Sequence, residues 1–185
     1  MELQGERLIP ASLTTTWAAL NDPEVLKGCI AGCESLDRSG EDAFQAVVAV
    51  RVGPVSARFK GNLKMTDVEA PHSYTIHFDG QGGVAGFGKG SADVSLAEEG
   101  DATRLRYVAR AQVGGKMAQI GSRLIDATAG KMAEDFFTAF ETALRPAEAA
   151  GLTPAPAAAA PKGNNVVWWV VGAAVVLAAL YFLMR

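Results

Sequence analysis

The sequence predicts an α+β domain in which one bent antiparallel sheet wraps around a long C-terminal helix, followed by a linker and one transmembrane helix. Segments in which apolar and polar residues alternate follow one another from residue 44 to residue 113, as in antiparallel strands. A helical apolar period then extends over residues 117–144. Because the sheet and the helix each have one apolar face, wrapping one around the other buries both faces.

The first part of the chain is predicted to form one short strand and two short helices. The strand has the sequence ELQGERLI. Ser12 or Thr14 can cap the first helix, and Asp22 followed by Pro23 can begin the second. An aspartate accepts hydrogen bonds from the free amides of a helix start, and proline is favoured at the first helical position.

The clearest strand follows a predicted turn at Gly53 and Pro54. Every second residue from Val55 to Met65 is apolar or glycine, and the residues between them are polar. This pattern is typical of an antiparallel strand with one face in solvent. Alternation predicts four more strands, at residues 44–52, 73–82, 87–96 and 104–113.

The long helix is expected to contribute one apolar stripe to the core. The residues of this stripe are Ile120, Leu124, Met132, Phe136, Phe140 and Leu144.

Small residues gather on the inward face of the later strands, beside large apolar ones. They either allow the helix to pack very closely or leave space for an apolar molecule, and the residues themselves leave both possibilities open. The predicted wall of such a cavity consists of Val48, Val50, Phe59, Leu63, Tyr74, Ile76, Phe78, Gly90, Ala92, Tyr107, Ala109, Met117, Ile120 and Leu124.

The sequence suggests no catalytic set and no metal site. His72 lies in a predicted turn and His77 on a predicted solvent face, and the inward positions carry no pair of carboxylates. Cys29 and Cys33 could share a helix face, but the two further ligands that a metal needs are missing, which favours buried thiols.

Composition and charge narrow the expected partners and compartment. Of the 185 residues 20% are charged, and the formal net charge of −3 comes without a basic run, so we expect no nucleic-acid partner. The N-terminal MELQGERLIP lacks the apolar core of a signal peptide. These features predict a domain, residues 1–145, that stays in the cytoplasm.

The C-terminal part is expected to tether this domain to the membrane. Residues 146–165 are rich in alanine and proline and are predicted to be a flexible linker. Residues 166–184 contain no charge and no proline, and as a helix they would span ~28 Å, close to the thickness of a bilayer core. Trp168 and Trp169 near one end and Tyr181 near the other suit the two lipid interfaces. We therefore expect a single-pass anchor at the cytoplasmic face of the inner membrane.

Four segments in this order resemble the CoxG family of carbon monoxide dehydrogenase subunits. They are DPEVLKGCIAGCESL, VRVGPVSARFKGNLKM, GFGKGSADVSL and VGGKMAQIGSRLIDATAGKMAEDFF. The resemblance covers residues 1 to about 145, with Ala31 standing where proline is expected between the two cysteines. It implies a helix-grip fold of the superfamily that includes START and Bet v 1 domains: a curved seven-stranded antiparallel sheet around the C-terminal helix, with an apolar cavity between them.

The resemblance also implies a role as a non-catalytic accessory protein beside a molybdenum-containing carbon monoxide dehydrogenase or a related hydroxylase. Such an enzyme must pass electrons to quinone in the membrane, so the expected ligand is menaquinone or ubiquinone, bound without a covalent link. Three alternatives remain: a recruitment protein with a filled core, a lipid carrier, and a cyclase-like enzyme of the same fold.

Overall fold

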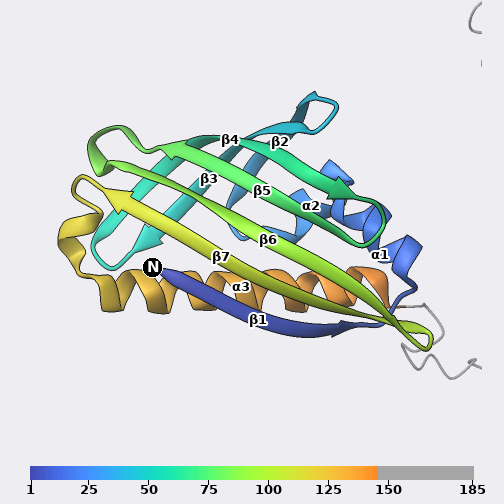
Figure 1. Ribbon diagram of the computed structural model, residues 1–185. Helices are drawn as coiled ribbons and strands as arrows, with labels where there is room; N and C mark the ends of the chain where they lie inside the picture. Colours follow the sequence, from blue (N-terminus) through green and yellow to red (C-terminus); the bar gives the residue numbers. More distant parts are fainter. Residues whose placement is uncertain (146–185) are drawn as a thin grey trace, which may run out of the picture. The chain divides into compact units, whose positions relative to one another are not determined.

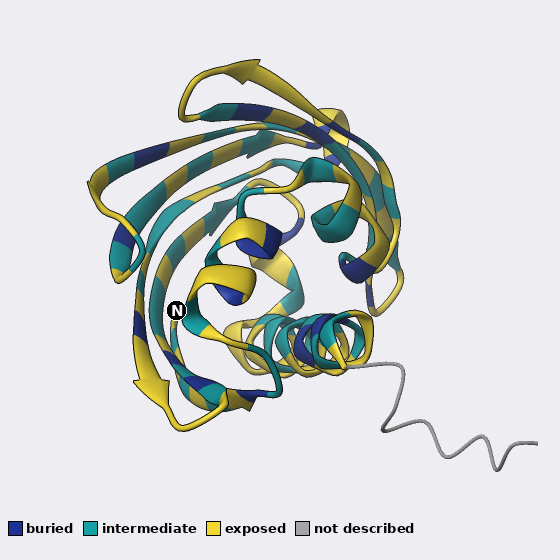
Figure 2. Cartoon of the chain, turned by 90° about the vertical axis from the view of Figure 1, so that its right-hand side faces the viewer, coloured by how far each residue is buried: buried dark blue, intermediate teal, exposed yellow. Residues whose placement is uncertain are grey.

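A computed structural model of the protein describes residues 1–145, which lie within one compact unit. Seven antiparallel strands form a single curved sheet, and helix α3 (Ser122–Leu144) lies along its concave side (Figure 1). Viewed from the end that carries helix α1 (Leu13–Leu20), the sheet curves around α1, α2 (Pro23–Cys29) and α3 (Figure 2). The expected seven-stranded sheet around a C-terminal helix is therefore confirmed.

The last six strands form a meander, and the first strand pairs with the last. The order is β1-β7-β6-β5-β4-β3-β2, so each strand from β2 to β7 pairs with its successor and β1 pairs with β7. The strands are β1 (Glu2–Ile9), β2 (Cys33–Gly40), β3 (Ala43–Val52), β4 (Val55–Glu69), β5 (Ser73–Gln81), β6 (Phe87–Glu99) and β7 (Ala102–Gly114).

Because neighbouring strands are antiparallel, their connections alternate between two ends of the sheet (Figure 1). One end, called here the α1 end, has the β2–β3, β4–β5 and β6–β7 hairpins. The other, called the η1 end, has the β3–β4 turn, the β5–β6 connection with the 3₁₀ turn η1 (Gly83–Ala85), and the β7–α3 connection with the 3₁₀ turn η2 (Ala118–Ile120).

Both predicted helix starts are present. The Ser12 hydroxyl oxygen accepts from the Thr15 amide at 3.3 Å, so Ser12 rather than Thr14 caps α1. A carboxylate oxygen of Asp22 accepts from the Glu24 amide at 2.9 Å, and Pro23 is the first residue of α2. These local signals are strong because they depend on a few neighbouring residues.

The alternation pattern did not reveal strand β2. Its sequence, CESLDRSG, has only one buried residue, Leu36. As an edge strand it pairs with β3 alone, and half of its length projects toward the hairpin tip, where no apolar face is needed.

Helix α3 begins later than predicted, and its apolar stripe begins at Ile125 instead of Leu124. Residues 118–120 form a 3₁₀ turn, Gly121 has φ 101°, and the α-helix starts at Ser122 instead of residue 117. Within α3, Leu124 and Met132 are eight residues apart, which at 3.6 residues per turn places them about 80° apart around the helix. Met132 borders the cavity, whereas Leu124, predicted to face the core, is 41% exposed and the next residue, Ile125, faces inward. In the second half of the helix, Phe140 is fully buried as predicted.

Two apolar clusters form the core, and both lie toward the α1 end. In the first, α3 packs on β1, β6 and β7, with the Tyr107 ring stacked on Phe137 at a centroid distance of 5.1 Å. In the second, Trp17 of α1 meets Tyr74 of β5 edge-on at 5.5 Å. Large side chains therefore fill the α1 end of the domain. At the other end, the first turns of α3 face the sheet across an open space.

The seven strands and both core clusters described above lie within residues 1–145, so this unit has a sheet and a core of its own. Within it, no helix is long and apolar enough to cross a membrane. The predicted linker at 146–165 and the predicted anchor at 166–184, with Trp168, Trp169 and Tyr181, lie outside the described residues.

Candidate ligand-binding site

A cavity of about 450 Å³ lies between the concave side of the sheet and the first half of α3. This volume falls within the range of sites that hold small molecules. Strand β3 lines it with alternate residues from Phe44 to Val52, and β4 with alternate residues from Phe59 to Met65. The remaining wall comes from α1 to β2, β5, the ends of β6 and β7, and one face of α3.

The inner wall of the cavity is hydrocarbon. Thr128 is the one lining residue with an inward polar group, and its hydroxyl donates to the Leu124 carbonyl at 2.8 Å. Asn62 and Asp79 border the cavity, but their side chains lie on the outer face of the sheet, where the Asn62 amide donates to the Asp79 carboxylate at 3.1 Å. Water needs two to four polar partners to be held, so this wall suits an apolar occupant.

Glycines open the wall where β4, β5 and β6 pass each other. Gly61 pairs with Gly80, and Gly80 with Gly88, so three neighbouring inward positions have no side chain. A Cβ on Gly88 would meet no atom within 4 Å, which shows that this position faces open space.

The cavity reaches the surface at the η1 end. Met1 and Phe87 line it and are 41% and 39% exposed. A second hollow shares these two residues with the cavity, together with Ala111, Val113 and Ile125. It adds Ser122 and Asp126 from the start of α3, and also Lys89 and Gln112, which lie on the outer face of the sheet in register with Asp79. The site is therefore apolar inside and polar at its mouth.

Half of the predicted wall residues border the cavity. These are Val48, Val50, Phe59, Leu63, Ile76, Phe78 and Met117. Whether they touch a ligand stays a prediction. Six of them were found because they belong to strands with regular alternation, in which every second residue faces the same side.

Three predicted small residues, Gly90, Ala92 and Ala109, do not border the cavity. A Cβ on Gly90 would lie 2.0 Å from the Arg110 carbonyl oxygen and 2.8 Å from the Phe78 ring, so no space exists there. Ala92 and Ala109 lie directly opposite each other in the β6–β7 pair, away from the cavity. In this part of the sheet the alternative interpretation, close packing, is the correct one.

Four larger predicted residues also lie elsewhere. Tyr74 and Tyr107 belong to the two core clusters, and burial raises the pKa of both phenols, that of Tyr74 far above its usual value. Ile120 and Leu124 lie over the β3–β4 turn, where a Cβ on Gly53 would be 3.9 Å and 2.9 Å from them. Ile120 lies in the 3₁₀ turn before α3, and Leu124 lies about 80° around α3 from the cavity residue Met132, so Ile125 takes the inward position instead.

Several wall residues were missed. The α3 side consists of Ile125, Thr128, Ala129 and Met132. Of these, Met132 was predicted to face the core, and following the 3.6-residue period back from it gives the other three. The α1 side consists of Leu20, Leu26, Ile30 and Leu36, whose contribution depends on how α1 and α2 pack and carries no local signal.

The two cysteines are separate and free. Cys29 is buried at the end of α2, and Cys33 begins β2. Burial raises the pKa of both thiols, which makes them poor nucleophiles. Residues 1–145 contain no group of three or more histidine, cysteine, aspartate or glutamate side chains suited to a metal ion.

Comparison with known proteins agrees with this fold. The family model of the carbon monoxide dehydrogenase subunit CoxG matches residues 5–145. No match was found among curated proteins.

Solved structures show the same architecture. A conserved protein from Geobacillus kaustophilus is 30% identical, with a TM-score of 0.73 over 78% of this chain and 95% of that one. A START superfamily protein from Mycobacterium smegmatis has a TM-score of 0.58 at 17% identity, over 77% and 96% of the two chains. The Zhui aromatase/cyclase from Streptomyces sp. R1128 has a TM-score of 0.60 at 9% identity, over 78% and 93%. At 17% and 9% identity, the similarity to the last two structures shows the fold alone.

Proposed function

We propose that this protein, which belongs to the CoxG family of carbon monoxide dehydrogenase subunits, is a non-catalytic accessory protein that binds a respiratory quinone and recruits a molybdenum enzyme to the membrane. The partner is a molybdenum-containing carbon monoxide dehydrogenase or a related hydroxylase. Residues 166–184 anchor the protein at the cytoplasmic face of the inner membrane, and residues 146–165 let the domain move on this tether.

The apolar cavity with a polar mouth is the observation that carries the proposal. An isoprenoid quinone is likewise apolar at one end and polar at the other, because its tail is hydrocarbon and its head has two carbonyl oxygens that accept hydrogen bonds. The cavity takes the tail, and Ser122 at the mouth can donate to the head. At about 30 Å³ per methylene-sized group, 450 Å³ holds roughly 15 carbons, or about three isoprene units.

The same observation bears on the three alternatives. A recruitment protein with a filled core would leave no cavity of this size. A cyclase needs groups that move protons at the substrate, and the inward side chains of the cavity wall are apolar apart from the hydrogen-bonded Thr128. A lipid carrier would use the same cavity, so it differs from the proposal in the ligand alone.

Titrating residues 1–145 with quinones of increasing tail length tests the ligand class. Trp17 is the only tryptophan in this segment, and it packs on the same cluster as the wall residues Leu26 and Ile30. We expect quinones to quench its fluorescence with a stoichiometry of one. Affinity should rise about tenfold or more for each isoprene unit and level off near the third, because further units find no more apolar wall.

A saturated fatty acid with a tail of equal length serves as the control and should compete weakly. Equal binding of the fatty acid would favour the lipid carrier, and no saturable quenching by any quinone would contradict the proposed ligand.

A further inference from the structure

Three connections at the η1 end form one preformed surface. The Met117 amide of the β7–α3 connection donates to the Ala85 carbonyl of η1 at 2.9 Å. A Cβ on Gly86 would lie 1.9 Å from the Gly114 carbonyl oxygen, so these two connections are in direct contact. Leu124 packs over the β3–β4 turn. Figure 1 shows this end opposite to α1.

This surface exposes large apolar side chains around the mouth of the cavity. Val84 at the tip of η1 is 85% exposed, Leu124 is 41% exposed, and Phe87 is exposed while also lining the cavity. Single exposed apolar residues are common, but Val84 on η1, Phe87 at the start of β6 and Leu124 in the first turn of α3 make a patch of the kind that marks an interaction site.

Unpaired cations surround this patch. Arg51, Lys116 and Arg123 lie in or beside the same connections, and residues 51–56, 81–88 and 114–124 contain no aspartate or glutamate. The first carboxylate of α3, Asp126, lies at the mouth of the cavity. None of the three cations takes part in an ion pair within residues 1–145.

Arginines on the outer face of the sheet form ion pairs with carboxylates. Arg58 pairs with Glu34, and Arg104 and Arg106 both pair with Glu6. The hydrogen bond from Arg106, and after it the one from Arg104, contributes most to holding the pKa of Glu6 below its usual value. These arginines of the outer face are therefore paired, whereas its lysines Lys60, Lys64 and Lys89 form no ion pair within residues 1–145. The η1 end differs from the outer face because its connections contain no carboxylates.

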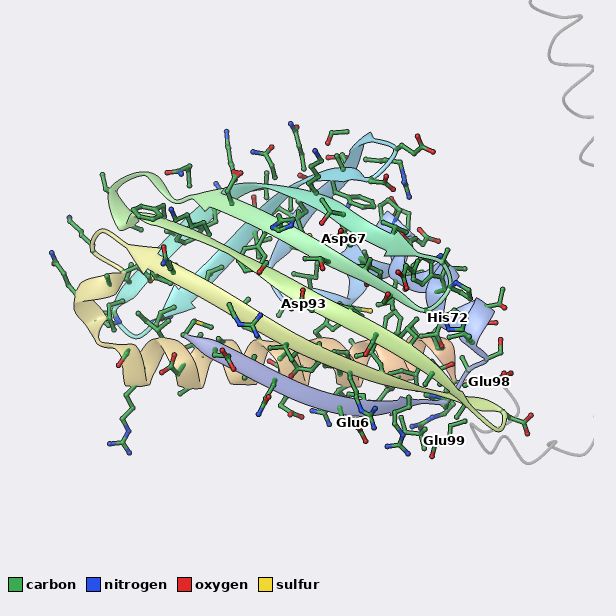
Figure 3. The ribbon with its side chains drawn as sticks, viewed as in Figure 1. Glu6, Asp67, His72, Asp93, Glu98 and Glu99 are labelled. Carbon is green, nitrogen blue, oxygen red and sulfur yellow. The ribbon has the colours of Figure 1, made fainter. Side chains whose placement is uncertain are left out.

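The α1 end has the opposite charge. Its three hairpins carry the carboxylates of Glu41, Asp42, Asp67, Glu69, Glu98, Glu99 and Asp101. Glu98 and Glu99 lie near the tip of the β6–β7 hairpin in Figure 3. A negatively charged surface would attract the η1 end and repel the α1 end, which fixes the orientation of the domain.

We propose that the η1 end docks on an anionic lipid bilayer. Val84, Phe87 and Leu124 enter the interface, while Arg51, Lys116 and Arg123 contact lipid phosphates. Apolar side chains combined with cations are the combination that such an interface selects. The mouth of the cavity then faces the lipid, so an apolar molecule can enter without crossing water. This surface is independent of the proposed quinone, partner and anchor, because it concerns residues 1–145 alone.

Vesicle binding by residues 1–145, which have a sheet and a core of their own and lack the predicted anchor, tests the proposal. In low salt we expect them to sediment with vesicles of phosphatidylcholine containing about one third phosphatidylglycerol, and not with pure phosphatidylcholine; salt should release them. Each lysine or arginine near such a surface contributes about fivefold to partitioning. Lys116→Gln with Arg123→Gln should therefore reduce binding by about 25-fold.

A matched control removes two unpaired cations elsewhere. Lys27→Gln with Lys64→Gln changes the net charge equally but lies outside the η1 end and should reduce binding far less. The proposal is overturned if residues 1–145 do not bind the anionic vesicles, or if the two double variants bind equally.

A separate experiment measures whether Val84 enters the bilayer. Val84→Trp places a tryptophan at the tip of η1, and lipids brominated on their upper acyl carbons should quench it in the vesicle-bound protein. Trp17, the single tryptophan of the unmodified segment, lies in the core toward the α1 end and should not be quenched. If both proteins are quenched alike, or neither is, Val84 does not enter the bilayer and the docking surface is wrong.

Discussion

Gly88→Phe should abolish quinone binding while the domain remains folded. Gly88 borders the cavity, and a Cβ at this position meets no atom within 4 Å. Its backbone is outside the left-handed region, so a side chain brings no strain there. The phenyl ring would project into the space proposed for the isoprenoid tail. We expect affinity to fall by a factor of 100 or more, and the free energy of unfolding to change by less than about 1 kcal/mol, since the ring buries apolar surface in an existing cavity.

Gly90→Phe is the matched control, because it introduces the same ring on the same face of β6. Here a Cβ would already lie 2.0 Å from the Arg110 carbonyl oxygen, so we expect a loss of more than about 3 kcal/mol or failure to fold. Chemical denaturation and quinone titration of both variants separate the two effects. If Gly88→Phe destabilises the protein as much as Gly90→Phe, the cavity is not open in solution.

Deleting residues 166–184 should release the protein and its partner enzyme from the membrane. The full chain is expected to resist extraction by carbonate and high salt, because its apolar segment would lose contact with hydrocarbon only at great cost. Without the segment, only the weaker contact at the η1 end remains, so high salt should extract the protein. The molybdenum enzyme should move to the soluble fraction, and quinone reduction on its substrate should slow.

The control for this deletion replaces residues 166–184 with an unrelated apolar helix of the same length. It should restore membrane location and electron delivery if the segment acts as an anchor alone. If the partner enzyme stays on the membrane after the deletion, recruitment is not the task of this protein. If respiration on the partner's substrate is also unchanged, delivery of quinone is excluded as well.

Much of the fold could be predicted because its signals are local. The alternation from Val55 to Met65 reappears as half-buried inward and exposed outward residues of β4, and Asp22 with Pro23 begins α2. Strand β2 was missed because an edge strand with one buried residue has no apolar pattern. The start of α3 was misplaced because an apolar period continues through the 3₁₀ turn, and the break at Gly121 has no counterpart in hydropathy.

The candidate site could be predicted only in part. Alternation identifies which residues of β3, β4 and β5 face inward, and most of them line the cavity, although Val55, Ala57 and Tyr74 do not. It cannot distinguish Gly88 from Gly90, which are the same residue type on the same face of β6. One faces open space and the other a carbonyl of β7, a difference set by the curvature of the sheet and the position of α3. The contribution of α1 and α2 likewise depends on packing between segments distant in sequence.

The most direct test of the account is the ligand carried by the native protein. The full chain should be purified from its own membranes in mild detergent, extracted with organic solvent and measured by mass spectrometry beside the Gly88→Phe variant. We predict about one isoprenoid quinone per molecule in the unmodified protein and almost none in the variant. Equal amounts in both, or no quinone in either, would show that the cavity is not a quinone site.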